Sequence, residues 1–141
     1  MKIRICSVIS AFCLLMSCAA TPASRKTSSV EVSCPSGMSL IKECRGSGPT
    51  RSGNGKIYAH VALCADGEKF SLGMQDSGMN TDSLLFMKKT KVDGLVVTSF
   101  YNSRPNVENG ELTFLNDDRT AATFTDGPYF EANYKADLKC Q

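Results

Sequence analysis

The sequence predicts an all-β domain, a small antiparallel barrel or sandwich of about eight strands stapled by disulfides. Short runs of alternating apolar and polar residues follow one another from Val30 onward. Turn residues separate these runs, and no 11-residue window has a helical period. Four cysteines in the same region, an even number, are typical of a disulfide framework in a small exported domain. Either architecture limits exposed strand edges, and we prefer the barrel.

The most distinct pattern is a β-hairpin around Asp66-Gly67. This dipeptide tolerates the positive φ angles of a two-residue type I′ turn. A turn centred there pairs Leu63 with Phe70, Val61 with Leu72 and Ala59 with Met74. All six side chains then lie on one face of the hairpin.

Three further segments follow the same pattern. Asp93-Gly94 joins 84–92 to 95–101, which pairs Val92 with Leu95 and Phe86 with Tyr101. A third hairpin joins 111–115 to 119–124. The last strand places Phe130, Ala132, Tyr134, Ala136 and Leu138 on one side. A strand over 38–44 completes the predicted set of about eight strands. The segments 45–55 and 102–110 are rich in Gly, Pro and Asn, and we expect them to be long loops suited to binding.

The first residues predict an export signal over 1–17. Lys2 and Arg4 give a positive start, and a mostly apolar run from Ile5 to Met16 follows. That run is too short to span a bilayer, which takes about 20 apolar residues in a helix. The run ends in Leu15-Met16-Ser17-Cys18.

These four residues resemble the lipobox of bacterial lipoproteins. The resemblance implies cleavage before Cys18 and a diacylglyceryl thioether on its sulfur, so that the membrane is a partner through the lipid anchor. Ala19 in place of an aspartate favours the outer membrane. Residues 18–31 would then be the lipidated cysteine and a flexible tether, and 32–141 the β-domain. The alternative is ordinary cleavage after Ala20 or Ala23, which would leave a secreted protein.

Cys34, Cys44, Cys64 and Cys140 are predicted to form two disulfides rather than a metal site, because the chain has no C-x-x-C pair and only one histidine. Three pairings are possible. Cys44 and Cys64 would lie at opposite ends of a hairpin, which disfavours that bridge. The expected pairs are Cys64 with Cys140 and Cys34 with Cys44.

No catalytic constellation, metal site or cofactor motif appears, and we expect no enzyme activity. His60 is expected to be a surface or pocket-lining residue. The segment 48–56 is glycine-rich but lacks the first glycine and the Ser or Thr of a phosphate-binding loop. Lys88, Lys89 and Lys91 are expected to protect an edge strand. Without the signal, 14 basic side chains balance 14 acidic ones, which gives no reason to expect nucleic acid as a partner.

The function predicted from these features is a membrane-tethered binding module of the bacterial envelope with a protein or envelope partner. The mature layout, with cysteines near both ends and short strands between, resembles the small periplasmic lysozyme-inhibitor lipoproteins, which are eight-stranded barrels. An inhibitor of a host hydrolase is therefore one alternative, although 102–110 carries a single acid where a basic enzyme would favour an acidic loop. The other alternative is a carrier of a small apolar ligand. Against the carrier, aromatic residues such as Phe70, Phe86 and Phe124 are expected to fill the barrel.

Overall fold

A computed structural model describes residues 32–50, 52–126 and 134–141, and these residues form one antiparallel sheet of nine strands and no helix. The strands are β1 (Ser39–Pro49), β2 (Lys56–Asp66), β3 (Lys69–Asp76), β4 (Leu85–Phe86), β5 (Lys89–Asp93), β6 (Val96–Tyr101), β7 (Arg104–Phe114), β8 (Ala121–Asp126) and β9 (Lys135–Cys140). Their order in the sheet is β4-β3-β2-β1-β9-β8-β7-β6-β5. The all-β prediction is confirmed.

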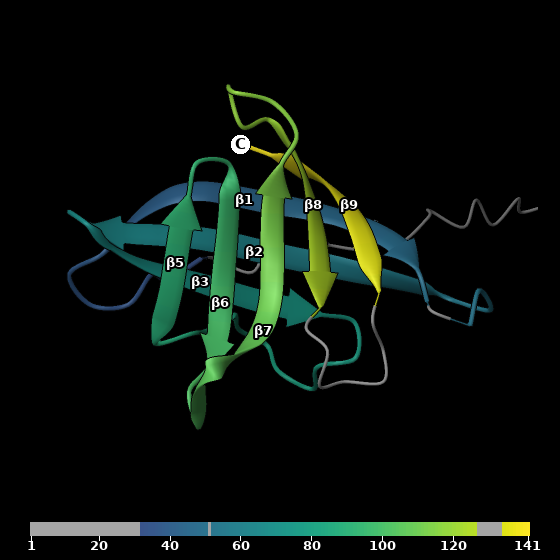
Figure 1. The fold of residues 1–141 in the computed structure, drawn as a ribbon. Coiled ribbons are helices and arrows are strands. Elements are labelled where there is room, and N and C mark those ends of the chain that lie inside the picture. Colours follow the sequence, from purple (N-terminus) through teal and green to yellow (C-terminus); the bar gives the residue numbers. More distant parts are fainter. Residues whose placement is uncertain (1–31, 51, 127–133) are drawn as a thin grey trace, which may run out of the picture.

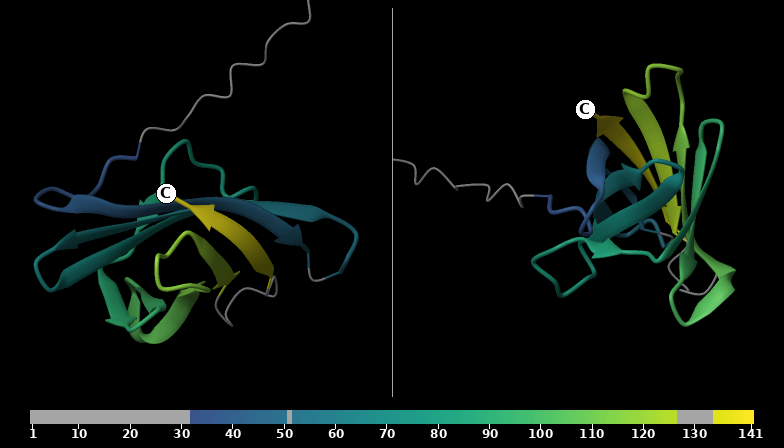
Figure 2. Two further views of the ribbon diagram at one scale, coloured as in Figure 1. Left: turned by 90° about the horizontal axis from the view of Figure 1, so that it is seen from above. Right: turned by 90° about the vertical axis from the view of Figure 1, so that its left-hand side faces the viewer.

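The sheet curls into a half-barrel. In Figure 1, β1, β2 and β3 run across the back while β5 to β9 cross in front of them at a steep angle, and Figure 2 shows the curl from above. The apolar inner faces of the two layers meet and form one core. Its largest fully buried side chains are Phe124, Leu63, Leu72, Leu112, Val61 and Val97.

The predicted strand 84–92 is two strands, and the pairing of Phe86 with Tyr101 is wrong. Phe86 on β4 pairs with Gly73 of β3, whereas β5 pairs with β6 at the other edge of the sheet. Between them the chain bridges the two edges: the Met87 N–H donates to the Leu72 carbonyl (3.0 Å), and the Leu72 N–H donates to Thr90 Oγ1 (3.1 Å). These contacts close the half-barrel at the β3 start, whereas among the described residues no strand pairing joins the end of β3 to β8.

Both Asp-Gly hairpins form, but their registers differ from the predicted ones by two residues. Leu63 lies opposite Leu72, and Val92 lies opposite Val97. Gly67 (φ 57°) and Gly94 (φ 60°) are the first of the two central turn residues, as in type II′ turns, and not the second as a type I′ turn assumes. Because an even shift keeps every side chain on its face, the predicted inner face is confirmed: Ala59, Val61, Leu63, Leu72 and Met74 are buried.

The third hairpin is confirmed, with Leu112 of β7 opposite Phe124 of β8. In β9, Ala136 and Leu138 are buried between exposed neighbours, as predicted, while Phe130 and Ala132 lie outside the described residues. The two predicted loops are shorter than expected: β1 continues to Pro49 and β7 begins at Arg104, so of these segments only the described residues 50, 52–55 and 102–103 lie between strands. Glycine and proline suggested loops there, but within β1 the glycines serve a close contact between strands.

The two disulfides are confirmed, but their expected pairing is wrong. The bonds join Cys34 to Cys64 (Cα–Cα 5.9 Å) and Cys44 to Cys140 (4.0 Å). The expected pairing assumed that the end of β2 lies beside the last strand. Instead β9 pairs directly with β1, which places Cys140 opposite Cys44. Cys64 lies one strand farther away and bonds the segment that precedes β1.

Gly46 and Gly48 allow β1 and β9 to approach closely. A Cβ atom added at Gly46 would lie 1.9 Å from the Asp137 carbonyl oxygen, and one added at Gly48 would lie 1.9 Å from that of Lys135. Both neighbours are backbone atoms, which cannot rotate away as a side-chain end can. Only glycine therefore fits here without moving β9.

We expect Gly46→Ala to lower the free energy of unfolding by more than about 2 kcal/mol, because its Cβ overpacks a strand junction. Ser47→Ala is the matched control. Ser47 is the next residue of β1, so its side chain points to the opposite face of the sheet, and the substitution should change the free energy of unfolding by no more than about 0.5 kcal/mol. Urea unfolding with both disulfides intact measures both values. Equal stability of the two variants would contradict this account of the β1–β9 junction.

Candidate functional site

Two recesses lie near the end of β3 at Asp76. The inner cavity, of about 250 Å³, is lined by Ile57, Met74, Asp76, Gly78, Met79, Asn109, Phe124, Asp126 and Tyr134. The outer groove, of about 700 Å³, is lined by Arg45, Gly46, Ser47, Tyr58, Ala59, His60, Gln75, Asp76, Ser77 and Met79. Asp76 and Met79 border both, and we describe each recess in turn.

The inner cavity follows from how the sheet curls. The start of β3 is held against β5 through Leu72 and Thr90, whereas its end at Asp76 faces Tyr134, which precedes β9. Phe86, expected to fill the barrel, instead packs on Gly73, where an added Cβ would come within 2.6 Å of its ring. This end therefore keeps an apolar cavity, with Ile57, Met74 and Phe124 among its walls.

Asp76 organises the polar side of this cavity. Its Oδ1 accepts hydrogen bonds from the backbone N–H groups of Gly78 (2.7 Å) and Met79 (3.0 Å), and its Oδ2 accepts one from the Tyr134 hydroxyl (3.0 Å). Burial, then the charge and hydrogen bond of Asp76, then the charge of Asp126, raise the pKa of Tyr134 far above its usual value. Tyr134 therefore stays protonated and donates to Asp76.

Asn109 is a second buried polar group on the cavity wall, with 6% of its surface exposed. Its Nδ2 donates to the thioether sulfur of Met87 (3.2 Å), a weak acceptor. Among the described residues, no donor bonds its amide oxygen.

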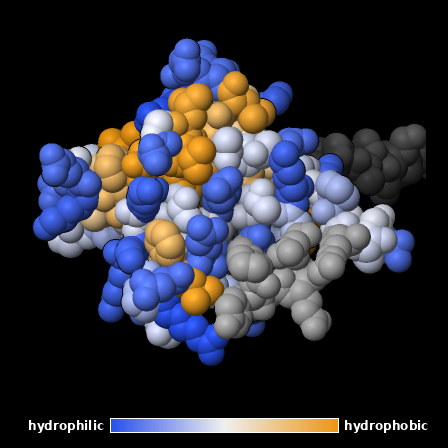
Figure 3. Space-filling model, in the orientation of Figure 1, coloured by the Kyte–Doolittle hydropathy of each residue, from blue (hydrophilic) through white to orange (hydrophobic). Residues whose placement is uncertain are grey.

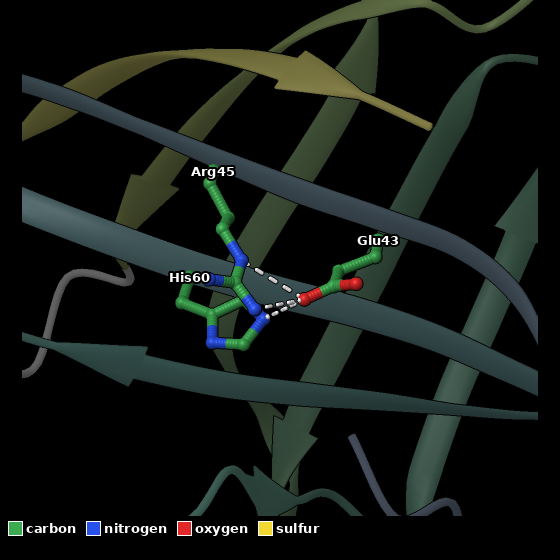
Figure 4. A network of polar contacts seen from close by, with 3 residues as sticks. All are labelled: Glu43, Arg45 and His60. Atoms are coloured by element: carbon green, nitrogen blue, oxygen red, sulfur yellow. Dashed lines mark hydrogen bonds and ion pairs between the residues drawn. The ribbon is translucent and has the colours of Figure 1, made fainter. Parts of the chain in front are cut away.

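The outer groove holds a polar network that links β1 and β2 (Figure 4). Glu43 Oε1 accepts hydrogen bonds from Arg45 Nε (2.9 Å) and Nη2 (2.5 Å), and it lies 2.6 Å from His60 Nε2. An ionised carboxylate only accepts, so a neutral His60 bonded to it carries its proton on Nε2. His60 is thus a groove-lining polar residue, as predicted, and its partner Glu43 was missed.

The pKa values of Glu43 and His60 are both lower than their usual values. Burial tends to raise the pKa of Glu43, but hydrogen bonds from Arg45 and His60 outweigh it and lower the value overall. Burial and the charge of Arg45 lower the pKa of His60 more than Glu43 raises it. At neutral pH the network therefore contains one anion, one cation and a neutral imidazole.

The lysines expected to protect an edge strand lie outside both recesses, and Cys18 lies outside the described part of the chain. Lys89 and Lys91 lie on β5, an edge strand, as predicted; Lys89 Nζ donates to the Pro105 carbonyl (2.9 Å). Lys56 lies 5.4 Å from the Tyr58 ring centre.

Apolar residues also reach the surface. Figure 3 shows them gathered toward the top of one face, near the turns that join β5 to β6 and β7 to β8. Leu115 is 61% exposed there, and Leu95 and Val96 are partly buried. No second feature of that patch indicates a partner.

The sequence analysis missed Asp76 and Asn109 as site residues. Asp76 ends a strand before Ser77-Gly78, which locally indicates only a turn, and Asn109 was assigned to a loop. Within the described ranges no three His, Cys, Asp or Glu residues are placed to hold a metal, and no helix is long and apolar enough to cross a membrane. No protein-family model, curated protein or solved structure matches this chain.

We expect His60 to titrate below pH 6.5, its ordinary pKa. Glu43→Gln should lower that pKa further by removing an anion, and Arg45→Ala should raise it by removing a cation. The chain has one histidine, so the imidazole Cε1–H signal in untagged protein reports the pKa directly. Shifts of the same sign in both variants would contradict the network.

The lowered pKa of His60 determines how the stability of the fold depends on pH. Because the unfolded chain binds a proton near pH 6.5 and the folded chain does not, His60 makes the fold less stable as pH falls through 6.5 toward the lowered value. Loss of the Glu43 bonds continues this trend below pH 4.5.

Proposed function

We propose that this chain is a lipid-anchored bacterial envelope protein whose β-domain is a binding module, and that the inner cavity is its binding site. The observation that carries this proposal is an apolar cavity with a few convergent polar groups, the usual form of a small-ligand site. A carrier of a small, largely apolar ligand is the form of binding module that this cavity favours.

Cysteine usage supports the export part of the proposal. Cys34, Cys44, Cys64 and Cys140 are all joined in disulfides, which persist in oxidising compartments such as the periplasm. Cys18 stands outside this framework, directly after the apolar run and Ser17. A lipid there and a tether over 18–31 would hold the domain at the membrane, with outer-membrane attachment as the expected location.

The inhibitor alternative has less support. The segment 102–110 belongs largely to β7, so it is no separate loop that could enter an active site. Two cations lie in or beside this segment: Lys89 donates to the Pro105 carbonyl, and Arg104 is the first residue of β7. The segment contains one acidic residue, Glu108. A basic hydrolase such as lysozyme would be repelled by such a surface rather than attracted to it.

For the anchor, we expect the mature protein from a Gram-negative membrane fraction to have the mass of a chain that begins at an acylated Cys18. Cys18→Ala should abolish that mass, because the thioether needs the sulfur. Cys13→Ala is the matched control, since it lies in the removed segment and should leave the acylated mass unchanged. An unmodified chain that begins at Thr21 or Ser24 in the soluble fraction would contradict the anchor.

For the cavity, we expect hexan-1-ol at millimolar concentration to shift the methyl signals of Met74 and Met79, which line it. The sample is the chain from Ala19 onward, oxidised so that both disulfides form and labelled with ¹³C in its methionine methyl groups. Met38, which does not line the cavity, should keep its signal. Shifts equal at all three methyl groups, or at none, would contradict a ligand site here.

A further inference from the structure

We infer that the inner cavity selects ligands that carry an ammonium group on a short apolar body, such as an alkylamine or an arylalkylamine. This inference rests on the proposed function, because it names the ligand class of the same cavity. It follows from the sense of the hydrogen bonds around the cavity, the charges on its wall and the aromatic side chains beside them.

Among the described residues, the polar groups on the cavity wall offer mainly hydrogen-bond acceptors; the one side-chain donor that the described bonds do not use is the second N–H of the Asn109 amide, since an amide nitrogen has two and one bonds Met87. The N–H groups of Gly78 and Met79 are already bound to Asp76, as is the Tyr134 hydroxyl hydrogen. Asn109 donates to Met87 and presents an amide oxygen without a donor among the described residues. A ligand that bonds the Asp76 carboxylate and the Asn109 oxygen must donate, and an ammonium group has three donors and no acceptor.

Asp76 gives the described part of the cavity wall a negative charge. Asp76 and Asp126 both line the cavity, and both act on Tyr134. The partners of Asp76 are neutral, and within the described residues no Lys, Arg or His forms an ion pair with it. A cationic ligand would supply that missing charge, whereas a carboxylate ligand would be repelled.

The apolar walls define the rest of the ligand. The rings of Phe124 and Tyr134 are tilted by 58° with centroids 6.2 Å apart, and aromatic rings attract an ammonium group within about 6 Å of their faces. Ile57, Met74 and Met79 remain for an alkyl or aryl body. A volume of about 250 Å³ lies just below the range of about 300–1,000 Å³ for drug-sized ligands, which favours a short body with one amine.

The experiment compares hexylamine, hexan-1-ol and hexanoate at pH 7, three probes of one chain length that differ in the head group. The Met74 and Met79 methyl signals report binding in the chain from Ala19 onward. We expect hexylamine to bind about tenfold more tightly than hexan-1-ol, and hexanoate to bind more weakly than both, since charge-assisted hydrogen bonds are the stronger ones.

Asp76→Asn tests the residue that carries the argument. Asparagine keeps a side-chain oxygen for the Gly78 and Met79 N–H groups but removes the charge, so hexylamine should lose about tenfold in affinity and hexan-1-ol less than about twofold. Asp93→Asn is the matched control, because Asp93 is a largely exposed aspartate in the turn-proximal part of β5, and neither affinity should change.

The outcomes separate the two proposals. Equal affinities for hexylamine and hexan-1-ol would overturn the ammonium inference while the cavity remains a ligand site. Absence of binding by all three probes would overturn the inference and the proposed binding site together. An equal loss of hexylamine binding in Asp76→Asn and Asp93→Asn would assign the selectivity to the overall field of the protein and overturn the role of Asp76.

Discussion

The junction between β1 and β9 is the constraint on which the rest of the structure depends. β1 pairs with β2 at one edge and with β9 at the other, so among the described strands the β1–β9 ladder is the backbone pairing that joins the layer of β1–β3 to the layer of β5–β9. Gly46 and Gly48 let the two strands approach, and the Cys44–Cys140 bond fixes them in register. The bond closes a sequence separation of 96 residues, a span over which cross-links stabilise by about 4–5 kcal/mol in the chain-entropy model.

The junction also determines where ligands have access. Because the two layers cross at an angle, β3 meets β5 near Leu72 and Thr90, and the end of β3 at Asp76 stays apart from β8.

The second disulfide has a different consequence. It joins Cys34, just before β1, to Cys64 of β2, so a pull on the preceding chain would reach the centre of the sheet without first separating β1 from β2.

Local patterns in the sequence predicted the strands and their inner faces, but they could not predict the order of distant strands. The register errors at Gly67 and Gly94 left those faces intact, because the shift is even. The wrong disulfide pairing came from strand order, since the β1–β9 pairing joins segments that no local signal connects. Asp76 and Asn109 were not predicted for the same reason. Locally, Asp76 indicates only a turn and Asn109 only a position in a strand or loop, and the cavity that they line forms only when β3 faces β8 in the folded sheet.

The two recesses differ in how their charges are compensated, and this difference points to the inner one as the binding site. In the outer groove, Glu43 bonds Arg45 and His60, so its negative charge is met within the network, and these bonds hold β1 to β2. In the inner cavity, the partners of Asp76 are neutral, and the amide oxygen of Asn109 has no donor among the described residues. The outer network is thus a structural cross-link between strands, and the inner cavity is the site that we propose for the ligand.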